Sequence, residues 1–361
     1  MKAVLLTGHG GLDNLQFRDD YPIPEVGPGD VLIHVKACGL NNTDINTRTA
    51  WYSSDVEQGI TREAVTDGYE EASAGDGSWG SSRIVFPIIQ GADVCGIVDS
   101  VGQDVSPDLV GQRVMVDPWF LDPQYPEDLS RARYYGSEIN GGFAEYTLVP
   151  AANVHTVNSP LSDTELATFA CAYTTAENLI QRTGLAKDET IVISGASGGV
   201  GTAAIQLARI RGAQVIALST PDKSQGLLEL GANHVVNRAE TNLAEAIRDI
   251  AGKAPDVAAD VVGGETFTAL VDSLRQGGRY SSSGCISGPM VNFDLRKLIY
   301  RDLQFTGATV VPKGTFARIV DYIESGLLKP VLSTVFPLEK LTSAQEMFML
   351  KKHIGNIVVT P

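Results

Sequence analysis

A glycine-rich loop between an apolar strand and an amphipathic helix is the feature that most constrains the fold of this chain. The sequence predicts a buried strand over 191–193, a loop of small residues over 194–201 and a helix over 200–211 that ends at Gly212. Such a loop lets the backbone approach a pyrophosphate closely, and the amides that open the helix bind its charge. The order therefore predicts a dinucleotide site, and the alternative is a tight turn that only packs the helix on a sheet.

The chain on the two sides of this region has two different textures. From about residue 155, strands alternate with helices, which predicts a parallel, doubly wound sheet. Its further strands are expected at 215–218, 235–236, 256–262 and 279–281. Before residue 150, short β-type runs are separated by glycine and proline, and residues 31–37 alternate apolar and polar side chains. The expected fold class is α/β, with a β-rich domain and a doubly wound domain.

The length, charge and cysteine content limit the partners of the protein. A chain of 361 residues is long enough for two domains, and 43 acidic against 28 basic side chains give a net charge of -15. Such a surface repels phosphate backbones and anionic lipids, and no run of about 18 apolar residues occurs. The four cysteines are far apart in the sequence, as in cytosolic proteins. We therefore expect a cytoplasmic protein with a small-molecule substrate and neither a nucleic acid nor a membrane as partner.

The end of the strand after the glycine loop bears on the choice of cofactor. A site for NAD needs an acid there, about 20 residues beyond the loop, to bind the ribose 2′-hydroxyl. In this chain Ser219 and Thr220 end the strand and Lys223 follows shortly. Neutral hydroxyls and a lysine suit the 2′-phosphate of NADPH, which a carboxylate would repel, so NADPH is the expected cofactor. Two alternatives stay open: Asp222 reaches the ribose after a small shift of the loop, or Lys223 is a solvated surface residue.

Several short motifs are similar to those of the medium-chain dehydrogenases/reductases. They are the glycine loop, the turns at 230–232 and 277–279, the strand end at 260–263 and the runs 39–44 and 91–98. The resemblance covers nearly the whole chain apart from an acidic, glycine-rich insertion at about 53–82. It implies a GroES-like catalytic domain over 1–154, a Rossmann NADPH-binding domain over 155–309 and a C-terminal return to the catalytic domain over 310–361. The insertion is either a lid over the substrate cleft or a bland mobile segment.

The same resemblance implies which residues contact the cofactor and how the chains associate. Thr175 matches a family position near the nicotinamide. The other implied cofactor residues lie in the glycine loop and after three further strands: Gly195, Ala196, Ser197, Gly198, Gly199, Val200, Gly201, Ser219, Thr220, Lys223, Val262, Gly263 and Gly284. Family habit also implies a homodimer or homotetramer, commonly paired through the edges of the cofactor-domain sheets.

The positions that bind zinc in metal-dependent members of the family are only partly kept. Those members have a cysteine at the position of Asn41, a histidine at that of Ala92 and a third ligand at that of Cys171. A catalytic zinc takes three protein ligands and a water, and an asparagine and an alanine replace neither a thiolate nor an imidazole. Asp93, beside the lost histidine, would still leave the site one ligand short. The four-cysteine structural zinc lobe is absent too, so no metal is expected.

The zinc-free, quinone oxidoreductase-like branch of the family has an Asn and an Asp at the positions of Asn41 and Asp44 and also matches Arg48 and Tyr52. The candidate catalytic residues are therefore two amide donors, an orienting pair and a hydroxyl donor: Asn41 and Asn42, Asp44 with Arg48, and Tyr52. Each has a structural alternative, since Asp44 fits a helix cap, Arg48 a structural role and Tyr52 a packing role. The chain departs from the branch at Asn46, where a tyrosine is more usual.

These features together favour an NADPH-dependent reductase of quinones or α,β-unsaturated carbonyl compounds. Conjugation spreads the charge that develops on such substrates, so the protein mainly positions two reactants in a dry cleft. Hydrogen-bond donors at the substrate oxygen add electrostatic stabilisation. One alternative is a zinc-free alcohol dehydrogenase or carbonyl reductase, and another is a non-catalytic NADPH-binding sensor or structural protein.

Overall fold

The computed structural model describes residues 1–69 and 84–361, so part of the acidic insertion expected at 53–82 lies outside the described residues. Contacts divide the chain into two compact units. The first unit holds Met1–Val56, Thr61–Cys171 and Phe316–Pro361, and the second holds Glu57–Ile60 and Ala172–Thr315.

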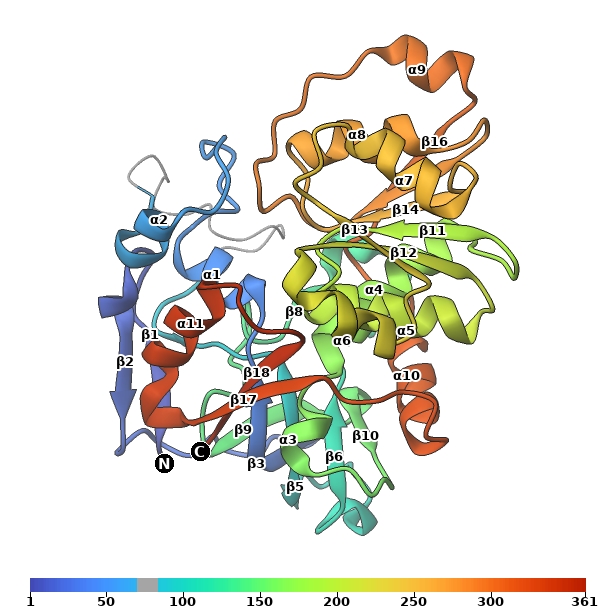
Figure 1. The fold of residues 1–361 in the computed structure, drawn as a ribbon. Coiled ribbons are helices and arrows are strands. Elements are labelled where there is room, and N and C mark those ends of the chain that lie inside the picture. The colour runs from blue at the N-terminus through green and yellow to red at the C-terminus, as the bar shows by residue number, and fades with distance from the viewer. Residues whose placement is uncertain (70–83) are drawn as a thin grey trace. The chain divides into compact units, whose positions relative to one another are not determined.

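The core of the first unit is a seven-stranded, mainly antiparallel sheet. Its strands follow the order β10-β6-β5-β3-β18-β17, and β9 pairs with β3. They span Asp30–Gly39 (β3), Asp93–Val101 (β5), Arg113–Val116 (β6), Tyr146–Pro150 (β9), Val154–Thr156 (β10), Leu332–Pro337 (β17) and Asn356–Thr360 (β18). Because β18 pairs antiparallel with the end of β3, with Val358 opposite Gly39, the last residues of the chain return to the sheet of the N-terminal strands (Figure 1).

Smaller elements complete the first unit. Strands β1 (Ala3–Leu6), β2 (Leu15–Arg18) and β4 (Ile88–Ile89) form a three-stranded sheet, and β7 (Trp119–Phe120) pairs with β8 (Arg133–Tyr134). The helices span Asn42–Arg48 (α1), Arg62–Asp67 (α2), Asp163–Leu166 (α3), Thr315–Glu324 (α10) and Leu341–Met349 (α11). Helix α3 contacts β3 and β5, and β10 pairs with β6, so the chain up to residue 171 belongs to this unit. The change of unit thus comes later than the boundary at 154/155 that the sequence pattern suggests.

The second unit is a parallel sheet with helices, as the alternation in the sequence predicts. Its six strands follow the order β13-β12-β11-β14-β15-β16, and every neighbouring pair is parallel. They span Thr190–Ile193 (β11), Gln214–Ser219 (β12), His234–Asn237 (β13), Val257–Asp260 (β14), Arg279–Ser282 (β15) and Gln304–Gly307 (β16). The helices span Ala170–Arg182 (α4), Gly199–Ile210 (α5), Ser224–Glu229 (α6), Leu243–Ala251 (α7), Glu265–Ser273 (α8) and Leu295–Tyr300 (α9). The strand order reverses between β11 and β14, which is the switch point of a doubly wound sheet.

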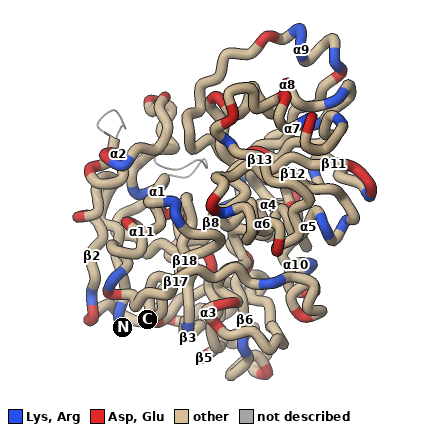
Figure 2. The backbone as a smooth tube through the Cα atoms, viewed as in Figure 1, with Lys and Arg blue, Asp and Glu red and all other residues tan. Residues whose placement is uncertain are grey.

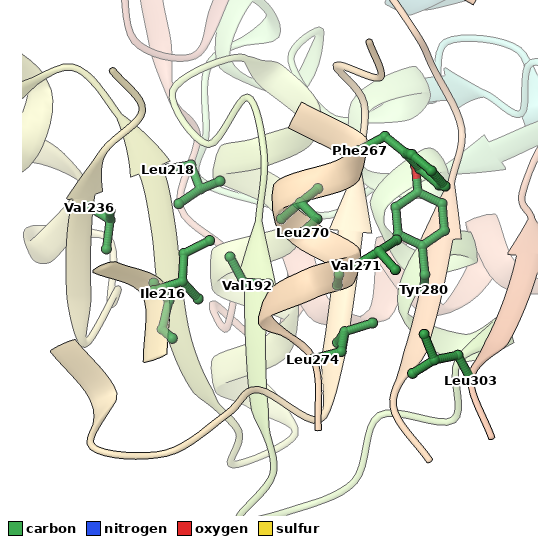
Figure 3. Close-up of a cluster of buried hydrophobic side chains, with 12 residues drawn as sticks. Val192, Ile216, Leu218, Val236, Phe267, Leu270, Val271, Leu274, Tyr280 and Leu303 are labelled. Atoms are coloured by element: carbon green, nitrogen blue, oxygen red, sulfur yellow. The ribbon is translucent and has the colours of Figure 1, made fainter. Parts of the chain in front are cut away.

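One apolar cluster joins the sheet of the second unit to helices α7 and α8. Figure 3 shows its side chains on the strands and on α8: Val192, Ile216, Leu218, Val236 and Tyr280, with Phe267, Leu270 and Val271. Ile247 adds a fully buried side chain from α7. Burying each large apolar side chain contributes about 1.5–3 kcal/mol, so this cluster holds both helices on one face of the sheet. The strands whose ends carry the candidate site are therefore rigidly supported.

The charged residues, the apolar segments and the cysteines of the structure agree with what the composition indicates. Figure 2 shows acidic and basic residues on the elements of both units. Among the described residues, no helix is long and apolar enough to cross a membrane. All four cysteines are free thiols, and Cys38, Cys95 and Cys171 are buried.

Candidate functional site

The predicted cofactor residues of the second unit lie where neighbouring parallel strands end. The glycine loop follows β11, Ser219 and Thr220 lie at the end of β12, Val262 and Gly263 follow β14, and Gly284 follows β15. Because these four strands are neighbours in a parallel sheet, their loops share one edge, which we call the carboxyl edge. Thr175 lies half-buried on α4.

The glycine loop needs its small residues for steric reasons. Gly195 has a φ of 56°, a left-handed conformation that residues with a side chain rarely adopt. A side chain at Gly201 would collide with the carbonyl oxygen of Gly195 and the backbone of Ala196, so the first turn of α5 packs directly on the loop. Gly198 caps α5 without a side chain, which leaves the amides of the first turn to an anion. This arrangement fits the pyrophosphate of a dinucleotide.

Asp260, at the end of β14, holds the glycine loop to the neighbouring loop. Its buried carboxylate accepts hydrogen bonds from Ser194 Oγ (2.5 Å), the amide of Val262 (2.8 Å) and the hydroxyl of Tyr280 (2.7 Å). The amide of Gly263 lies 3.2 Å from both carboxylate oxygens. These bonds offset the cost of burying the carboxylate and fix the two loops together. In the sequence, the signal for this role is that Asp260 is an acid at the end of an otherwise apolar strand. The family motif at 260–263 alone does not indicate that the carboxylate joins the two loops.

A lysine lies against the glycine loop near the end of β12. Lys223 is 8% exposed, and its Nζ donates a hydrogen bond to Ser197 Oγ at 3.3 Å. Burial lowers the pKa of this lysine. Asp222 is exposed on the same turn, where a hydrogen bond with the Thr220 side chain lowers the pKa of the Asp222 carboxyl group. The lysine is therefore not a solvated surface residue, and it is the lysine rather than the aspartate that contacts the glycine loop.

In the first unit, Asn41 connects the end of β3 to a buried pair of acids. Its backbone N–H donates to Asp44 Oδ2 (2.7 Å), and its side-chain Nδ2 donates to Asp93 Oδ2 (3.0 Å). The backbone amide of Cys171 donates to the other oxygen of Asp93. We call these four residues the Asn41 cluster. Asp44 also completes a capping box at the start of α1, so its structural alternative, the helix cap, is present in the fold.

Burial dominates the protonation of the Asn41 cluster. It raises the pKa of Asp44 to about 8 and the pKa of Asp93 to about 7. Hydrogen bonds from Asn41 and Cys171 oppose these shifts only in part. Burial also raises the pKa of the neighbouring Cys38 thiol, and the charges of both acids raise it further. Near neutral pH the two carboxyl groups therefore carry fewer than two charges, which lowers the cost of enclosing both.

Arg48 does not bind Asp44, so the expected orienting pair does not form. The Arg48 side chain is fully enclosed, with Nε donating to Gln345 Oε1 (3.0 Å) and Nη1 donating to the carbonyl oxygen of Gly10 (2.8 Å). Both acceptors are neutral, and burial lowers the pKa of the guanidinium to about 10. The physical reason is that the Asp44 carboxylate turns back to the N-terminus of α1, while Arg48 at its C-terminus reaches α11. An enclosed guanidinium cannot contact a substrate.

Asn42 and Tyr52 are half-buried and bind neighbours in the same unit. Asn42 Oδ1 accepts a hydrogen bond from Lys351 Nζ at 2.9 Å. Burial raises the pKa of Tyr52 to about 12, and hydrogen bonds with the side chains of Thr43 and Asn46 oppose this rise. The Tyr52 hydroxyl is thus held by α1, the helix that begins at the Asn41 cluster.

The Asn41 cluster does not fit a zinc ion. Asn41 directs its side-chain nitrogen at Asp93, and both oxygens of Asp93 already accept hydrogen bonds from the protein. The Cys171 thiol forms a hydrogen bond with buried Tyr134, a contact that no pattern in the sequence indicates. Within 1–69 and 84–361, no three His, Cys, Asp or Glu side chains are grouped as metal ligands. Of Asn41, Ala92 and Cys171, which stand at the three zinc-ligand positions of metal-dependent members, only the cysteine can bind zinc, whereas a catalytic zinc needs three protein ligands.

Comparisons with known proteins assign the family. Residues 27–159 match the alcohol dehydrogenase GroES-like domain, and residues 199–325 match the zinc-binding dehydrogenase family. A crystal structure from Sinorhizobium meliloti 1021, provisionally described as an alcohol dehydrogenase, is 42% identical with a TM-score of 0.91, and the match covers 100% of this chain and 96% of that chain. The chain therefore belongs to the medium-chain dehydrogenase/reductase superfamily. It is an oxidoreductase of that family, whose members bind a nicotinamide cofactor, and the expected GroES-like and Rossmann-type folds are confirmed.

Two named relatives of similar identity carry out different reactions. The chain is 27% identical to an NAD-dependent alcohol dehydrogenase of Sulfolobus acidocaldarius, over 99% of this chain and 99% of that protein. It is 26% identical to the quinone oxidoreductase of Homo sapiens, over 96% of this chain and 93% of that protein. These two names therefore do not assign the substrate, which depends on the residues of the site.

Proposed function

We propose that this oxidoreductase depends on NADPH, works without zinc and reduces a quinone or an α,β-unsaturated carbonyl compound. The observation that carries the proposal is the Asn41 cluster. The Asn41 amide and the hydrogen-bonded Asp93 carboxylate lie at or beside the positions that bind zinc in metal-dependent members of the family. A protein without a Lewis acid suits a substrate whose conjugation spreads the developing charge. The similarity to the human quinone oxidoreductase over 96% of the chain supports the same substrate class.

The preference for NADPH is supported by the side chains near the end of β12. Ser219 and Thr220 carry no charge that would repel a 2′-phosphate, and Lys223 supplies a cation against the glycine loop. The amides that open α5 would hold the pyrophosphate, and the loop that Asp260 fixes would flank it. When bound, NADPH supplies the hydride.

The proposed substrate contacts come from the first unit. Asn42 and Tyr52 keep exposed surface, so they are our proposed donors to a substrate oxygen. Asn41 and Asp44 are buried and would act by fixing the first turn of α1, on which Asn42 lies. Arg48 would then stabilise the same helix from its other end.

Two other functions have specific support. A zinc-free alcohol dehydrogenase or carbonyl reductase is favoured by the similarity to the Sulfolobus acidocaldarius alcohol dehydrogenase. A non-catalytic NADPH-binding sensor or structural protein is the other alternative, since the name of one human relative, synaptic vesicle membrane protein VAT-1 homolog (25% identical over 100% of this chain), states no reaction.

We also propose that the chain forms a homodimer or homotetramer through the edge of the second unit. Strand β16 is the last strand of the six-stranded sheet, and α9 before it exposes Leu295 (63%), Ile299 (62%) and Tyr300 (73%). An unpaired sheet edge beside exposed apolar side chains is typical of an interface. A cytoplasmic location is proposed from the reduced state expected of four separate thiols.

A turnover assay tests the proposed function. Purified protein is mixed with NADPH or NADH and with a panel of quinones, enones, aldehydes and ketones, and the absorbance of the reduced cofactor is followed. Faster consumption of NADPH with quinones or enones is the expected result. Oxidation of secondary alcohols would favour the alcohol dehydrogenase instead. Tight NADPH binding without turnover on any substrate would favour the sensor or structural role.

A further inference from the structure

Lys351 lies beside Asn42, which is a proposed donor to the substrate oxygen. Lys351 follows α11, and strand β18 after it pairs antiparallel with the end of β3, so the C-terminal segment returns to the start of α1. The Nζ of Lys351 donates a hydrogen bond to Asn42 Oδ1 at 2.9 Å, although the two residues are 309 positions apart in the sequence. This contact joins the last segment of the chain to the first turn of α1.

An aromatic ring holds the Lys351 side chain in this place. Its Nζ lies 3.8 Å from the centre of the Phe348 ring, a cation–π contact with a ring that is 7% exposed. The Phe348 ring in turn lies 5.4 Å from the His353 ring. Because Lys351 is half-buried, its apolar stem is packed against neighbours while the ammonium stays near the surface. The ammonium therefore keeps a defined place next to Asn42.

The backbone of Lys351 has a conformation that favours glycine. Its φ is 53°, and it directly follows Leu350, the C-cap of α11. Glycine is the usual residue in a left-handed conformation after a helix, because a residue with a side chain is strained there. Such strain is concentrated at functional sites. A lysine at this position thus indicates that its side chain has a role that glycine could not fill.

The ammonium decides which way the Asn42 amide faces. A lysine ammonium has hydrogen-bond donors and no acceptor, so it binds the oxygen of an amide and not the nitrogen. With Oδ1 bound to Lys351, the Nδ2 group of Asn42 points to the other side, where it meets no acceptor among the residues that the structure describes. Asn42 is half-buried and keeps exposed surface. Its Nδ2 group can therefore donate to an oxygen of a bound ligand.

We infer that Lys351 is a positioning residue, which holds the Asn42 amide so that Nδ2 donates to the substrate oxygen. This inference rests on the proposed function and deepens it. The substrate gains a hydride from the cofactor, which is oxidised to NADP⁺, and then a proton from water. Between these two events the substrate oxygen carries negative charge, and a donor that is already oriented stabilises this charge without turning first. The positive charge of Lys351 also polarises the amide, which strengthens Nδ2 as a donor.

A purely structural role is the competing account, in which Lys351 only joins α11 to α1. Loss of such a contact would lower the stability of the protein and would change the rate only through unfolding. Loss of an orienting contact lowers kcat in a protein that is still folded, and it does so only while Asn42 is present. The melting temperature and kcat, measured together, separate the two roles.

The test measures the melting temperature, the dissociation constant of NADPH, and kcat and KM for the quinone or enone that the wild type reduces fastest. Lys351→Gly removes the ammonium but suits the left-handed backbone, so it should melt close to the wild type. We expect its kcat to fall about tenfold at an unchanged affinity for NADPH. Lys351→Arg also has donors only and should keep most of the rate. Lys352 is exposed, and Lys352→Met should behave as the wild type.

A double-mutant cycle shows whether Lys351 acts through Asn42. Asn42→Ala should lower kcat by about tenfold or more, because the donor itself is lost. Adding Lys351→Gly to Asn42→Ala should then cause no further loss, since no amide remains to be oriented. Asn42→Asp still accepts from Lys351 but has no N–H group to donate, so it should be as slow as Asn42→Ala.

The outcomes that overturn the inference are distinct from each other. A wild-type kcat in Lys351→Gly would refute the role of Lys351 and leave the proposed reductase intact. Weaker NADPH binding at unchanged kcat, in both Lys351→Gly and Asn42→Ala, would assign the amide to the cofactor instead of the substrate. A further tenfold loss in the double variant would contradict an action through Asn42. A wild type that reduces neither quinones nor enones would refute the proposed function, and the inference with it.

Discussion

Ser194 directly follows β11, Asp260 ends the neighbouring strand β14, and a 2.5 Å hydrogen bond from the serine hydroxyl to Asp260 Oδ1 joins them. Because Ser194 directly precedes Gly195, this bond fixes the start of the glycine loop. The same carboxylate holds the amides of Val262 and Gly263 in the loop after β14. One buried acid thus couples two of the loops that we propose hold the cofactor.

Replacing Asp260 with alanine should destabilise the second unit and weaken cofactor binding together. Ser194, Tyr280 and two backbone amides lose their acceptor, at about 1–3 kcal/mol for each buried group left unsatisfied. We expect a lower melting temperature and roughly tenfold weaker NADPH binding, measured by thermal denaturation and by titration. Asp249 is exposed on α7, so Asp249→Ala is the control that should change neither. Unchanged NADPH affinity in Asp260→Ala would mean that the loops keep their geometry without this carboxylate.

Arg48→Met should reduce stability while leaving catalysis intact. The methionine fills most of the enclosed space but removes the donors to Gln345 and Gly10, which we expect to cost about 2 kcal/mol of unfolding free energy. Denaturant unfolding and steady-state kinetics on the folded variant measure the two effects. Arg131 is largely exposed, and Arg131→Met should alter neither. A large loss of kcat at wild-type stability would instead assign Arg48 to catalysis.

The raised pKa of Asp44 should make the protein less stable as the pH rises. The pKa is about 8 in the folded chain against an ordinary 3.8, so between about pH 4 and pH 8 the folded state binds more protons than the unfolded state. The contribution of Asp44 to the free energy of unfolding must then fall with pH across this window, by at most about 1.4 kcal/mol per pH unit for one proton. Asp44→Asn stays neutral and still accepts from the N–H of Asn41, so its stability should fall less steeply.

Denaturant unfolding at several pH values within that window measures the slope. Asp99 is exposed on β5, and Asp99→Asn should keep the wild-type slope. A wild-type slope in Asp44→Asn would contradict the burial of a protonated carboxyl group at this position.

Charges on α9 should separate the proposed oligomer. Leu295→Asp with Ile299→Asp places two carboxylates on the exposed apolar surface beside β16, where burial against a second copy would be costly. Size-exclusion chromatography with light scattering should show a smaller assembly than the wild type. Leu327 is 53% exposed in the first unit, and Leu327→Asp should leave the assembly unchanged. A wild type that is already monomeric would refute the proposed pairing.

The parallel sheet could be predicted from the sequence because its strands are short apolar runs between turn residues. The runs 191–193 and 215–218 lie inside β11 and β12. The run 256–262 extends past β14, which ends at Asp260, because the carboxylate of this residue turns back to the amides of Val262 and Gly263. A period of two cannot show where such a side chain ends a strand.

The candidate site was less predictable, since its contacts join distant parts of the sequence. The capping box between Asn41 and Asp44 is local and has a sequence signature. Asp93, by contrast, lies 52 residues from Asn41, and no pattern in the chain indicates that they meet. The spacing of Asp44 and Arg48 suggests a helical pair, yet Arg48 binds Gln345, which is 297 residues away. Burial and tertiary contacts decide these partners.

Metal analysis combined with turnover tests the account most directly. Zinc content is measured in the purified protein by mass spectrometry, and the rate of NADPH consumption with a quinone is measured before and after treatment with a chelator. The Asn41 cluster predicts far less than stoichiometric zinc and an unchanged rate. Stoichiometric zinc together with a rate that the chelator abolishes would contradict the zinc-free mechanism.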